Sequence, residues 1–508
     1  MKKIFKKENL IFLLTIILCT LIVIYFDIQK ETYDGDELYT YTLSTSAKGG
    51  FMGGNFPLDT FNNPDIINES LTLQREELFD LRTIYYNQVN DVHPPLYYFL
   101  FHYISIFSFN KFSKWPGLIL NLLIYLFTLF LVFSITKNLT NNKYFPFITT
   151  LVYGISNGAI STQLFIRMYM LLTMFCLLFI YLIIKLTQNK NNNQLFLLLT
   201  ITTFLGFMTH YYFLVFAFIY SLIYFIYTLV KKRYSHLLKF SISVLSGVIC
   251  GYIVFPASYN HLFNSYHDVS TSNNLIHSNI IYNLKSIYKR LNIELFYSIL
   301  PVILILLLIL IIYKIITKKH FNNPYIIYLT SGSIIYFLLV LKITPILSTR
   351  YIYNIYPIIE IVLCLLICNI IKNYKLPKII LTIIFIPLAY SNIFINEVSW
   401  CNQIPKEDTS VINTYKNYPY LYLANSDYDL TSKTFYARLF KEFYITYHID
   451  EESINYITTY LKDNSYNGIV IDISNTIDQE KYLHEIASIM NYSKRIDTNL
   501  GIILESHP

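Results

Sequence analysis

The chain has 508 residues, of which 54% are hydrophobic, 17% are aromatic and only 14% are charged. Soluble domains carry about 25% charged residues, and the apolar residues here occur in blocks of about 20, the length at which a helix crosses a bilayer. A soluble globular protein is therefore excluded. The net charge of +7 comes largely from short basic connectors such as 231–236 and 317–320, so it indicates membrane topology and not nucleic-acid binding.

The first predicted element is an uncleaved membrane anchor at about residues 9–28. It follows the basic start MKKIFKK, and no small-residue cleavage site follows its apolar run. Positive charge behind this span predicts a cytoplasmic N-terminus and an outer position for the acidic stretch 29–92. The stretch contains a glycine-rich turn region at 47–57 and predicts an amphipathic surface helix over 68–87, with its cap near Asn68 or Ser70.

The segment 93–109 starts with HPPLYYF and predicts a re-entrant or interfacial element. If it crosses the membrane completely, the orientation of every later span is reversed. We adopt the topology without that crossing, because it places the basic connectors inside. The further spans are predicted near 115–136, 144–165, 167–187, 194–209, 211–230, 237–257, 295–316, 323–343, 350–372 and 375–394.

The tail, 395–508, carries more charge and contains the short strand-like runs YLYLA, GIVIDI and GIILE. A helical stretch is predicted over 479–495, and the alternation predicts a small α/β domain. The predicted fold class is an all-α polytopic membrane domain over 1–394, with about 11 or 12 membrane helices, followed by this α/β domain outside the membrane. The six cysteines show no metal-ligand spacing, and Cys364 and Cys368 are interpreted as packing residues.

Under this topology, polar residues gather at the outer ends of the spans. Charged residues next to apolar segments are costly and tend to mark function. Carboxylates can act as general bases and arginines can bind phosphate oxygens, which favours a reaction that activates a hydroxyl and releases a phosphate. The candidates are Asp34, Asp36, Glu37, Asp91, His93, Arg167, His210 and Arg350, with His261, His267 and Asp268 as weaker members in the loop 258–293.

Each candidate has a structural alternative. Asp36 and Glu37 are typical of a helix N-terminus, which favours acids. Arg167 and Arg350 are typical of snorkelling residues at span ends. Asp91 and His93 are consistent with a turn at the interface, and His210 with an interfacial aromatic belt. The sequence leaves these alternatives open.

The stretch DGDELYTY after the first span, followed by DVHPPLYYF, resembles the GT-C glycosyltransferases, in particular the protein-mannosyltransferase-like group of family 39 and its bacterial relatives, including aminoarabinose-transferase-like enzymes. The shared features are an Asp-Glu pair at the start of the first outer loop and a His-Pro-Pro-Leu segment where that loop returns to the membrane. RMYMLL, THYYF and RYIYNIYP resemble later elements of the group more weakly. The resemblance covers about residues 10–370.

The resemblance implies an inverting, hexosyltransferase-like transfer of a sugar from a polyprenyl-phosphate donor to a hydroxyl on a glycan, lipid or protein acceptor. Asp36 matches the catalytic acid and Glu37 would assist it, while Asp34 and Asp91 would play supporting parts. The His-Pro-Pro segment, with His93 and Tyr97, would shape the donor pocket. The remaining elements imply a donor-phosphate site made by Arg167, Arg350 and His210, with support from Tyr169 and Tyr351.

The sequence also departs from this group. Tyr97 and Tyr98 stand where eukaryotic members carry Gly-Lys, Asp34 is an additional acid, and the tail does not resemble a β-trefoil domain. No glycine-rich nucleotide loop and no certain cofactor is indicated, and a divalent metal remains open. A polysaccharide polymerase or ligase and a lipid-linked oligosaccharide transporter are the competing classes, although no internal repeat typical of transporters is seen.

Overall fold

Apolar helices dominate the residues that the computed structural model describes, namely 2–45, 57–188, 192–264, 274–275, 277–316, 324–344, 346–371, 387–401, 403–404, 406–426, 433, 435–474, 483, 492–498 and 500–506. Seven helices in these ranges are long and apolar enough to cross a membrane: Lys7–Gln29, Trp115–Leu139, Tyr169–Gln188, Tyr212–Val230, Tyr234–Val254, Pro324–Ile343 and Thr349–Leu366. Helices satisfy their backbone hydrogen bonds internally, as a lipid environment requires. The predicted polytopic all-α class is confirmed.

The chain divides into two units, each built from separate stretches of sequence. The first unit comprises Met1–Gln29, Gln88–Tyr97 and Leu118–Cys401, and the second comprises Lys30–Asn87, Tyr98–Gly117 and Asn402–Pro508. The acidic stretch Lys30–Asn87 therefore belongs to the same unit as the tail. The predicted boundary at residues 394–395 stays a prediction.

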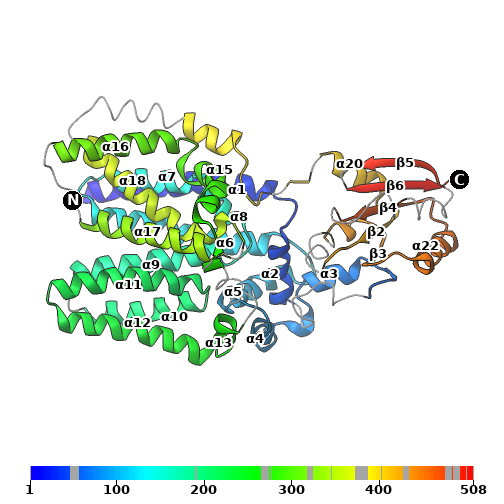
Figure 1. The fold of residues 1–508 in the computed structure, drawn as a ribbon, viewed down its shortest axis with the longest axis horizontal. Coiled ribbons are helices and arrows are strands. Elements are labelled where there is room, and N and C mark those ends of the chain that lie inside the picture. Colours follow the sequence, from blue (N-terminus) through cyan, green and yellow to red (C-terminus); the bar gives the residue numbers. More distant parts are fainter. Residues whose placement is uncertain are drawn as a thin grey trace. The chain divides into compact units, whose positions relative to one another are not determined.

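Helices of the first unit pack side by side in a bundle (Figure 1), in which α11 contacts both α9 and α17, and α17 contacts α18. Gly247 lets α12 approach α10 closely, because a Cβ atom there would lie 2.6 Å from the Thr200 carbonyl oxygen. The helices of this unit are α1 (Lys2–Gln29), α6 (Trp115–Leu139), α7 (Phe145–Gly154), α8 (Asn157–Leu164), α9 (Tyr169–Gln188), α10 (Asn193–Phe207), α11 (Tyr212–Val230), α12 (Tyr234–Val254), α13 (Ser258–Phe263), α15 (Ile280–Phe296), α16 (Leu300–Ile316), α17 (Pro324–Ile343), the 3₁₀ helix η4 (Thr349–Ile355), α18 (Tyr356–Ile371) and the π-helix η5 (Ser391–Ile395).

Several predicted spans differ from the helices observed. In place of one helix over 144–165, α7 ends at Gly154 and α8 starts after Ser156, whose hydroxyl accepts a hydrogen bond from the Ala159 N–H as an N-cap. The predicted span 295–316 is interrupted at Tyr297, which has a left-handed backbone conformation. The helix α10 has 15 residues, fewer than the roughly 20 that a perpendicular crossing needs. Most of the predicted span 375–394 lies outside the described residues.

The second unit contains a six-stranded sheet with the order β1-β3-β2-β4-β6-β5. The central strands β3, β2 and β4 are parallel, whereas β1, β6 and β5 are added by antiparallel pairing. The strands are β1 (Phe61–Asn62), β2 (Pro419–Leu423), β3 (Glu442–Thr446), β4 (Gly468–Ile473), β5 (Tyr492–Thr498) and β6 (Gly501–Ser506). The three predicted strand runs are confirmed as β2, β4 and β6, and β1 comes from the first outer loop.

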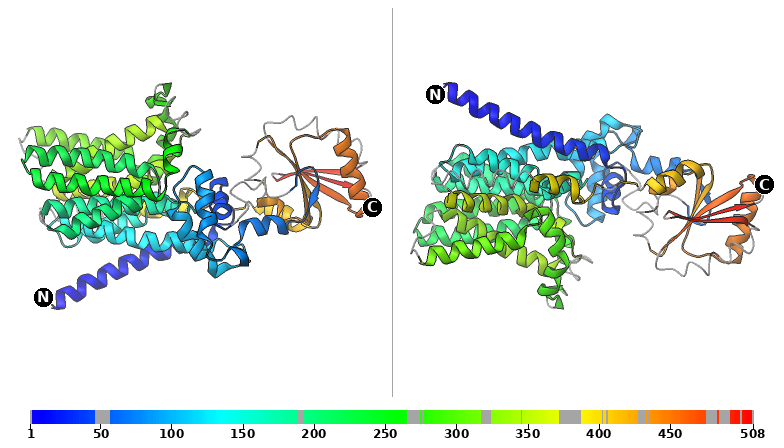
Figure 2. Two further views of the ribbon diagram at one scale, coloured as in Figure 1. Left: turned by 90° about the horizontal axis from the view of Figure 1, so that it is seen from below. Right: turned by 90° about the horizontal axis from the view of Figure 1, so that it is seen from above.

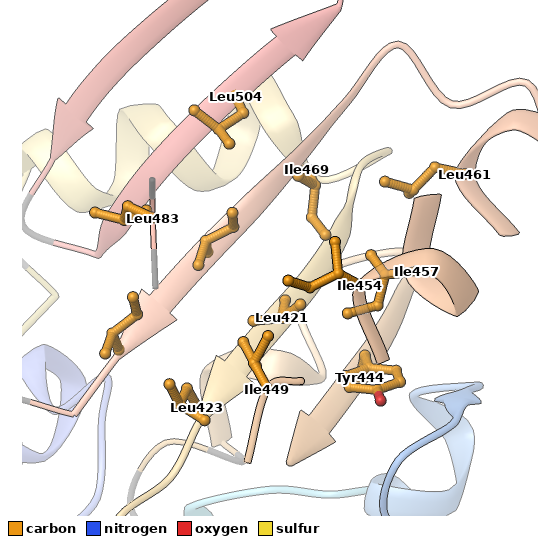
Figure 3. Packing of buried hydrophobic residues seen from close by; sticks show 12 residues of the cluster. Leu421, Leu423, Tyr444, Ile449, Ile454, Ile457, Leu461, Ile469, Leu483 and Leu504 are labelled. Atoms are coloured by element: carbon orange, nitrogen blue, oxygen red, sulfur yellow. The ribbon is translucent and has the colours of Figure 1, made fainter. Parts of the chain in front are cut away.

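The core of this α/β part lies between the sheet and the helix α22 (Glu451–Asp463) (Figures 2 and 3). Ile454, Ile457 and Leu461 recur on one face of α22 and pack with Leu421 and Ile469 of the central strands. The helix predicted over 479–495 lies mostly outside the described residues, but its end from Tyr492 onward is strand β5.

The remaining helices of the second unit are short: α2 (Gly35–Thr45), α3 (Asp65–Leu71), the 3₁₀ helices η2 (Arg75–Glu77) and η3 (Ile106–Ser108), and α20 (Lys406–Tyr415), while α4 (Leu81–Asn90) and α5 (Leu96–Ser105) contribute to both units. The single surface helix predicted over 68–87 is wrong. The extended backbone at Thr72 ends α3, and Phe79 has a positive φ angle that no regular helix accommodates.

Candidate active site

The Asp91–His93 pair precedes the two prolines and lies in the first unit. The Asp91 Oδ2 and His93 Nδ1 atoms are 3.1 Å apart, and the side chains are 23% and 19% exposed. Pro94 and Pro95 directly precede α5, where missing N–H groups cost nothing, and the Leu96 N–H donates to the Met208 carbonyl oxygen at 3.0 Å. This bond fixes the segment on the turn between α10 and α11.

The Asp91 carboxyl stays ionised in this position. Burial alone raises its pKa, but the hydrogen bond and charge of His93, with a further contribution from the charge of Arg167, outweigh that effect and leave the pKa below the usual aspartate value. The site therefore carries a fixed negative charge next to a histidine and an arginine.

His210 connects this pair to an aromatic group. Its ring centroid lies 5.5 Å from that of His93 and 5.5 Å from that of Tyr169, and it stacks on Tyr212 at 5.1 Å. The Tyr212 N–H donates to His210 Nδ1 at 3.1 Å, which sets the orientation of the imidazole ring. Tyr351 closes the group, 6.0 Å from Tyr169.

Arg167 and Arg350 are the cations of this site, and both are largely buried, with exposed fractions of 4% and 9%. The Arg350 guanidinium carbon lies 5.1 Å from the centroid of Tyr351 and 5.8 Å from that of Phe165, and its Nη2 donates to the Tyr351 hydroxyl at 3.3 Å. A snorkelling arginine would extend toward water instead. A buried guanidinium group among aromatic rings, such as that of Arg350, suits a phosphate that approaches from a lipid environment.

Tyr97 supports the site through buried hydrogen bonds. Its side chain is fully buried, and its hydroxyl donates to Asn121 Oδ1 at 2.9 Å. The Asn121 amide in turn donates to the carbonyl oxygens of Gln163 and Phe165, both at 2.8 Å. Tyr97 therefore holds the turn that carries Arg167.

The acids of DGDE belong to the second unit, where they start α2. The Asp36 N–H donates to Asp34 Oδ1 at 3.0 Å, and the Asp34 N–H donates to Glu37 Oε2 at 2.9 Å. The Asp34 side chain thus caps the helix at its second N–H, and the Glu37 side chain returns to the N–H of Asp34, as the N3 glutamate of a capping box does. Glu37 also forms a fully buried ion pair with Lys30 at 3.0 Å. Asp34 and Glu37 thus have structural roles, while the Asp36 side chain is half-buried on the first turn.

Sequence inspection missed three further residues, Lys30, Glu294 and Trp400. Lys30 follows the first span and is a basic residue in an acidic stretch. This unusual charge could have drawn attention to it. Glu294 and Trp400 lie in the first unit, where burial raises the pKa of the Glu294 carboxyl although Ser399, Thr349 and Tyr356 lower it in part.

Of the weaker candidates, His261 lies near the Asp91–His93 pair. It lies 2.8 Å from the Tyr211 hydroxyl and 3.1 Å from the Val89 carbonyl oxygen, and burial lowers its pKa, with smaller contributions from the charges of Asp91 and His93. His267 and Asp268 lie outside the described residues. Within the described ranges, no group of three or more His, Cys, Asp or Glu residues has a geometry for a metal ion.

Comparison with solved structures identifies the fold. The crystal structure of ArnT from Cupriavidus metallidurans bound to undecaprenyl phosphate matches with a TM-score of 0.52 and 10% identity, over 97% of both chains. The apo state of the same protein gives 0.54 and 9%, again over 97% of both chains. The chain has the GT-C fold.

The archaeal oligosaccharyltransferase AglB from Archaeoglobus fulgidus, in complex with an inhibitory peptide and a dolichol-phosphate, matches at a TM-score of 0.47 and 10% identity, over 98% of this chain and 74% of that chain. No family model and no curated protein sequence matches the chain. The likeness to known proteins therefore lies in the fold, which the motif resemblance predicted.

Proposed function

We propose that this GT-C protein is a membrane glycosyltransferase that moves a sugar from a polyprenyl-phosphate donor to a hydroxyl acceptor on the outer face of the membrane. The observation that carries the proposal is the burial of two arginines in this fold, Arg350 against the Phe165 and Tyr351 rings and Arg167 near the Asp91 carboxylate. The ArnT crystal structure, which shares the fold, holds undecaprenyl phosphate, and this lipid has the chemistry that such a pair would bind.

The proposed reaction is an inverting displacement. The Asp36 carboxylate accepts the proton of the acceptor hydroxyl, the hydroxyl oxygen bonds to the anomeric carbon, and the bond from that carbon to the phosphate oxygen breaks. The polyprenyl phosphate leaves with the electron pair of that bond. Arg167 and Arg350 stabilise the charge that develops on the phosphate, and Asp91 holds His93 beside them.

The role of Asp36 is testable with variants that differ only in the proton acceptor. Asp36→Asn should lower turnover by about 10²–10⁴-fold, the typical contribution of a positioned base, and leave binding of undecaprenyl phosphate unchanged. Asp34→Asn is the matched control, because asparagine caps a helix as well as aspartate does. The measurement is transfer of radiolabelled hexoses from undecaprenyl phosphate by the purified protein in lipid, with membrane extract as the acceptor.

Loss of transfer in Asp34→Asn with retention in Asp36→Asn would show that the base is Asp34. Glu37→Gln should have an intermediate effect on turnover. If neither aspartate variant changes turnover, the assignment of this loop to catalysis is wrong.

The phosphate site is testable through binding alone. Arg350→Ala and Arg167→Ala should each weaken binding of radiolabelled undecaprenyl phosphate by about 10- to 100-fold, the worth of one charged hydrogen bond. Arg82→Ala is the control, since the Arg82 side chain is 95% exposed. Unchanged binding in both buried-arginine variants would contradict the proposal.

A further inference from the structure

The segment Val398–Cys401 follows the last helix of the first unit and packs back onto it. Trp400 has a φ of 65°, a conformation that residues other than glycine keep only where their surroundings fix it. The Trp400 indole Nε1 donates to the Tyr353 hydroxyl at 3.0 Å. The Ser399 N–H donates to the Ser161 hydroxyl at 3.1 Å, so backbone and side chains both hold the segment.

Trp400 continues an aromatic stack that reaches Arg350. Its ring lies 4.1 Å from that of Phe165 at an angle of 18°, and Phe165 stacks on Tyr169 at 5.6 Å and 16°. Phe165 is also one of the two rings beside the Arg350 guanidinium. Any displacement of Trp400 would therefore change the surface against which Arg350 packs.

Glu294 ties the same segment to the helix that carries Arg350. Its carboxylate accepts hydrogen bonds from the hydroxyls of Ser399 at 2.6 Å, Tyr353 at 3.2 Å and Tyr356 at 2.9 Å. Tyr353 lies in η4 with Arg350, and Tyr356 begins α18. One buried acid therefore connects α15 and the Val398–Cys401 segment with the C-terminal part of η4 and the start of α18.

We infer that Trp400 and Glu294 are positioning residues for Arg350, so that the Val398–Cys401 segment forms the wall behind the phosphate-binding guanidinium. This inference rests on the proposed function and extends it. It predicts that the segment leading to the C-terminal α/β part sets the affinity for a polyprenyl phosphate, although none of its residues needs to contact that lipid.

The first experiment uses the two tryptophans of the chain, Trp115 and Trp400. In Trp115→Phe, titration of undecaprenyl phosphate into the protein in nanodiscs should shift the fluorescence emission maximum of Trp400, and the shift should saturate with lipid concentration. The matched control is Trp400→Phe, in which the 41% exposed Trp115 remains and no saturable shift should occur. No shift in Trp115→Phe, or equal shifts in both variants, would contradict the inference.

The second experiment measures affinity for radiolabelled undecaprenyl phosphate. Trp400→Phe keeps a ring for stacking but loses the N–H donor, so binding should weaken about 2- to 10-fold, the worth of a neutral hydrogen bond. Trp400→Ala should weaken it further. Glu294→Gln should resemble Trp400→Phe, because its amide oxygen still accepts a hydrogen bond. Size-exclusion profiles identify any variant that fails to fold.

A double-mutant cycle then distinguishes positioning from general damage. If Trp400 acts through Arg350, Trp400→Phe should have no further effect on binding in an Arg350→Ala background. Additive effects would overturn the inference. Unchanged binding in Trp400→Phe and Trp400→Ala, while Arg350→Ala binds weakly, would overturn it and leave the proposed function standing. Unchanged binding in Arg350→Ala itself would remove the phosphate assignment as well.

Discussion

At the scale of single residues, the acids of DGDE organise the start of α2. Asp34 and Glu37 exchange hydrogen bonds with the backbone at the start of α2, and Glu37 is neutralised by Lys30 in the interior. Asp36 lies between them at the second position of the helix, and acidic side chains are common in the first turn of a helix. Asp36 is the acid of this group that matches the catalytic position implied by the GT-C resemblance, and the Asp36→Asn variant tests its proposed role as the base.

The buried ion pair gives a prediction about stability. Lys30→Met should lower the free energy of unfolding by about 3–5 kcal/mol, because it leaves the Glu37 carboxylate buried without its cation. The double variant Lys30→Met with Glu37→Gln should recover most of this loss. The measurement is thermal unfolding of the protein in detergent.

The exposed pair of Arg82 and Asp80 provides the comparison, since one partner is 95% exposed and such pairs contribute about 0–1 kcal/mol. Arg82→Met should therefore leave the unfolding temperature almost unchanged. An equal effect of the two single substitutions would mean that burial of the Lys30–Glu37 pair does not determine its contribution.

At the scale of elements, the site depends on helices that end early. The break between α7 and α8 and the short 3₁₀ helix η4 replace what would otherwise be continuous membrane helices. Arg167 lies in the turn between α8 and α9, and Arg350 lies in η4. Tyr297 interrupts the chain between α15 and α16. Non-helical backbone in a membrane domain is tolerated where it is buried in protein and hydrogen-bonded there, and all seven residues of η4 are buried.

The close packing of α8 predicts a sensitive position. A Cβ atom on Gly158 would lie 2.6 Å from the Tyr356 ring and 2.8 Å from the Glu294 carbonyl oxygen, so Gly158→Val should destabilise the protein by about 1–3 kcal/mol through overpacking. It should also weaken undecaprenyl phosphate binding, since Glu294 and Tyr356 hold the Arg350 segment. Thermal unfolding and lipid binding are the two measurements.

Leu197→Ala on α10 serves as the control for this substitution, because Leu197 is 61% exposed and removing its side chain disturbs no packed helix contact. Normal stability of Gly158→Val would show that α8 and α18 can separate without cost.

At the scale of the whole molecule, the first outer loop and the tail form one unit. Phe61 of the loop pairs with Tyr444 of the tail as part of β1 and β3 and stacks on Tyr460 of α22, with ring centroids 4.0 Å apart. The Tyr33 and Phe435 rings also lie 5.1 Å apart. The α/β part is therefore completed by sequence that precedes it by several hundred positions.

The proposed topology belongs to this scale as well. A cytoplasmic N-terminus and an external tail follow from the positive-inside pattern, so cysteines at Tyr234 and Ser410 should label from opposite sides. Both positions are exposed. Labelling with a membrane-impermeant maleimide in a cysteine-free background is the measurement, and labelling of both from the same side would contradict this topology.

The sequence by itself determined the features whose causes are local. Hydropathy marked the long helices, because each must satisfy its own backbone in lipid, and the runs at 419–423, 468–473 and 501–506 were recognisable as strands. The acid-histidine pair, the double proline and the capping acids act within a few positions of one another, so their patterns are legible in the chain. The GT-C fold also followed from short motifs.

Only the tertiary structure decided which distant groups meet. Glu294 gains its partners from residues 59, 62 and 105 positions away, and Trp400 reaches Phe165 across a still longer separation. The strand β1 could not be predicted from the sequence, because its two residues form a strand only through pairing with β3 and stacking of Phe61 on Tyr460. Such contacts depend on tertiary packing, because the local sequence around a buried acid or a tryptophan on a turn does not indicate its distant partners.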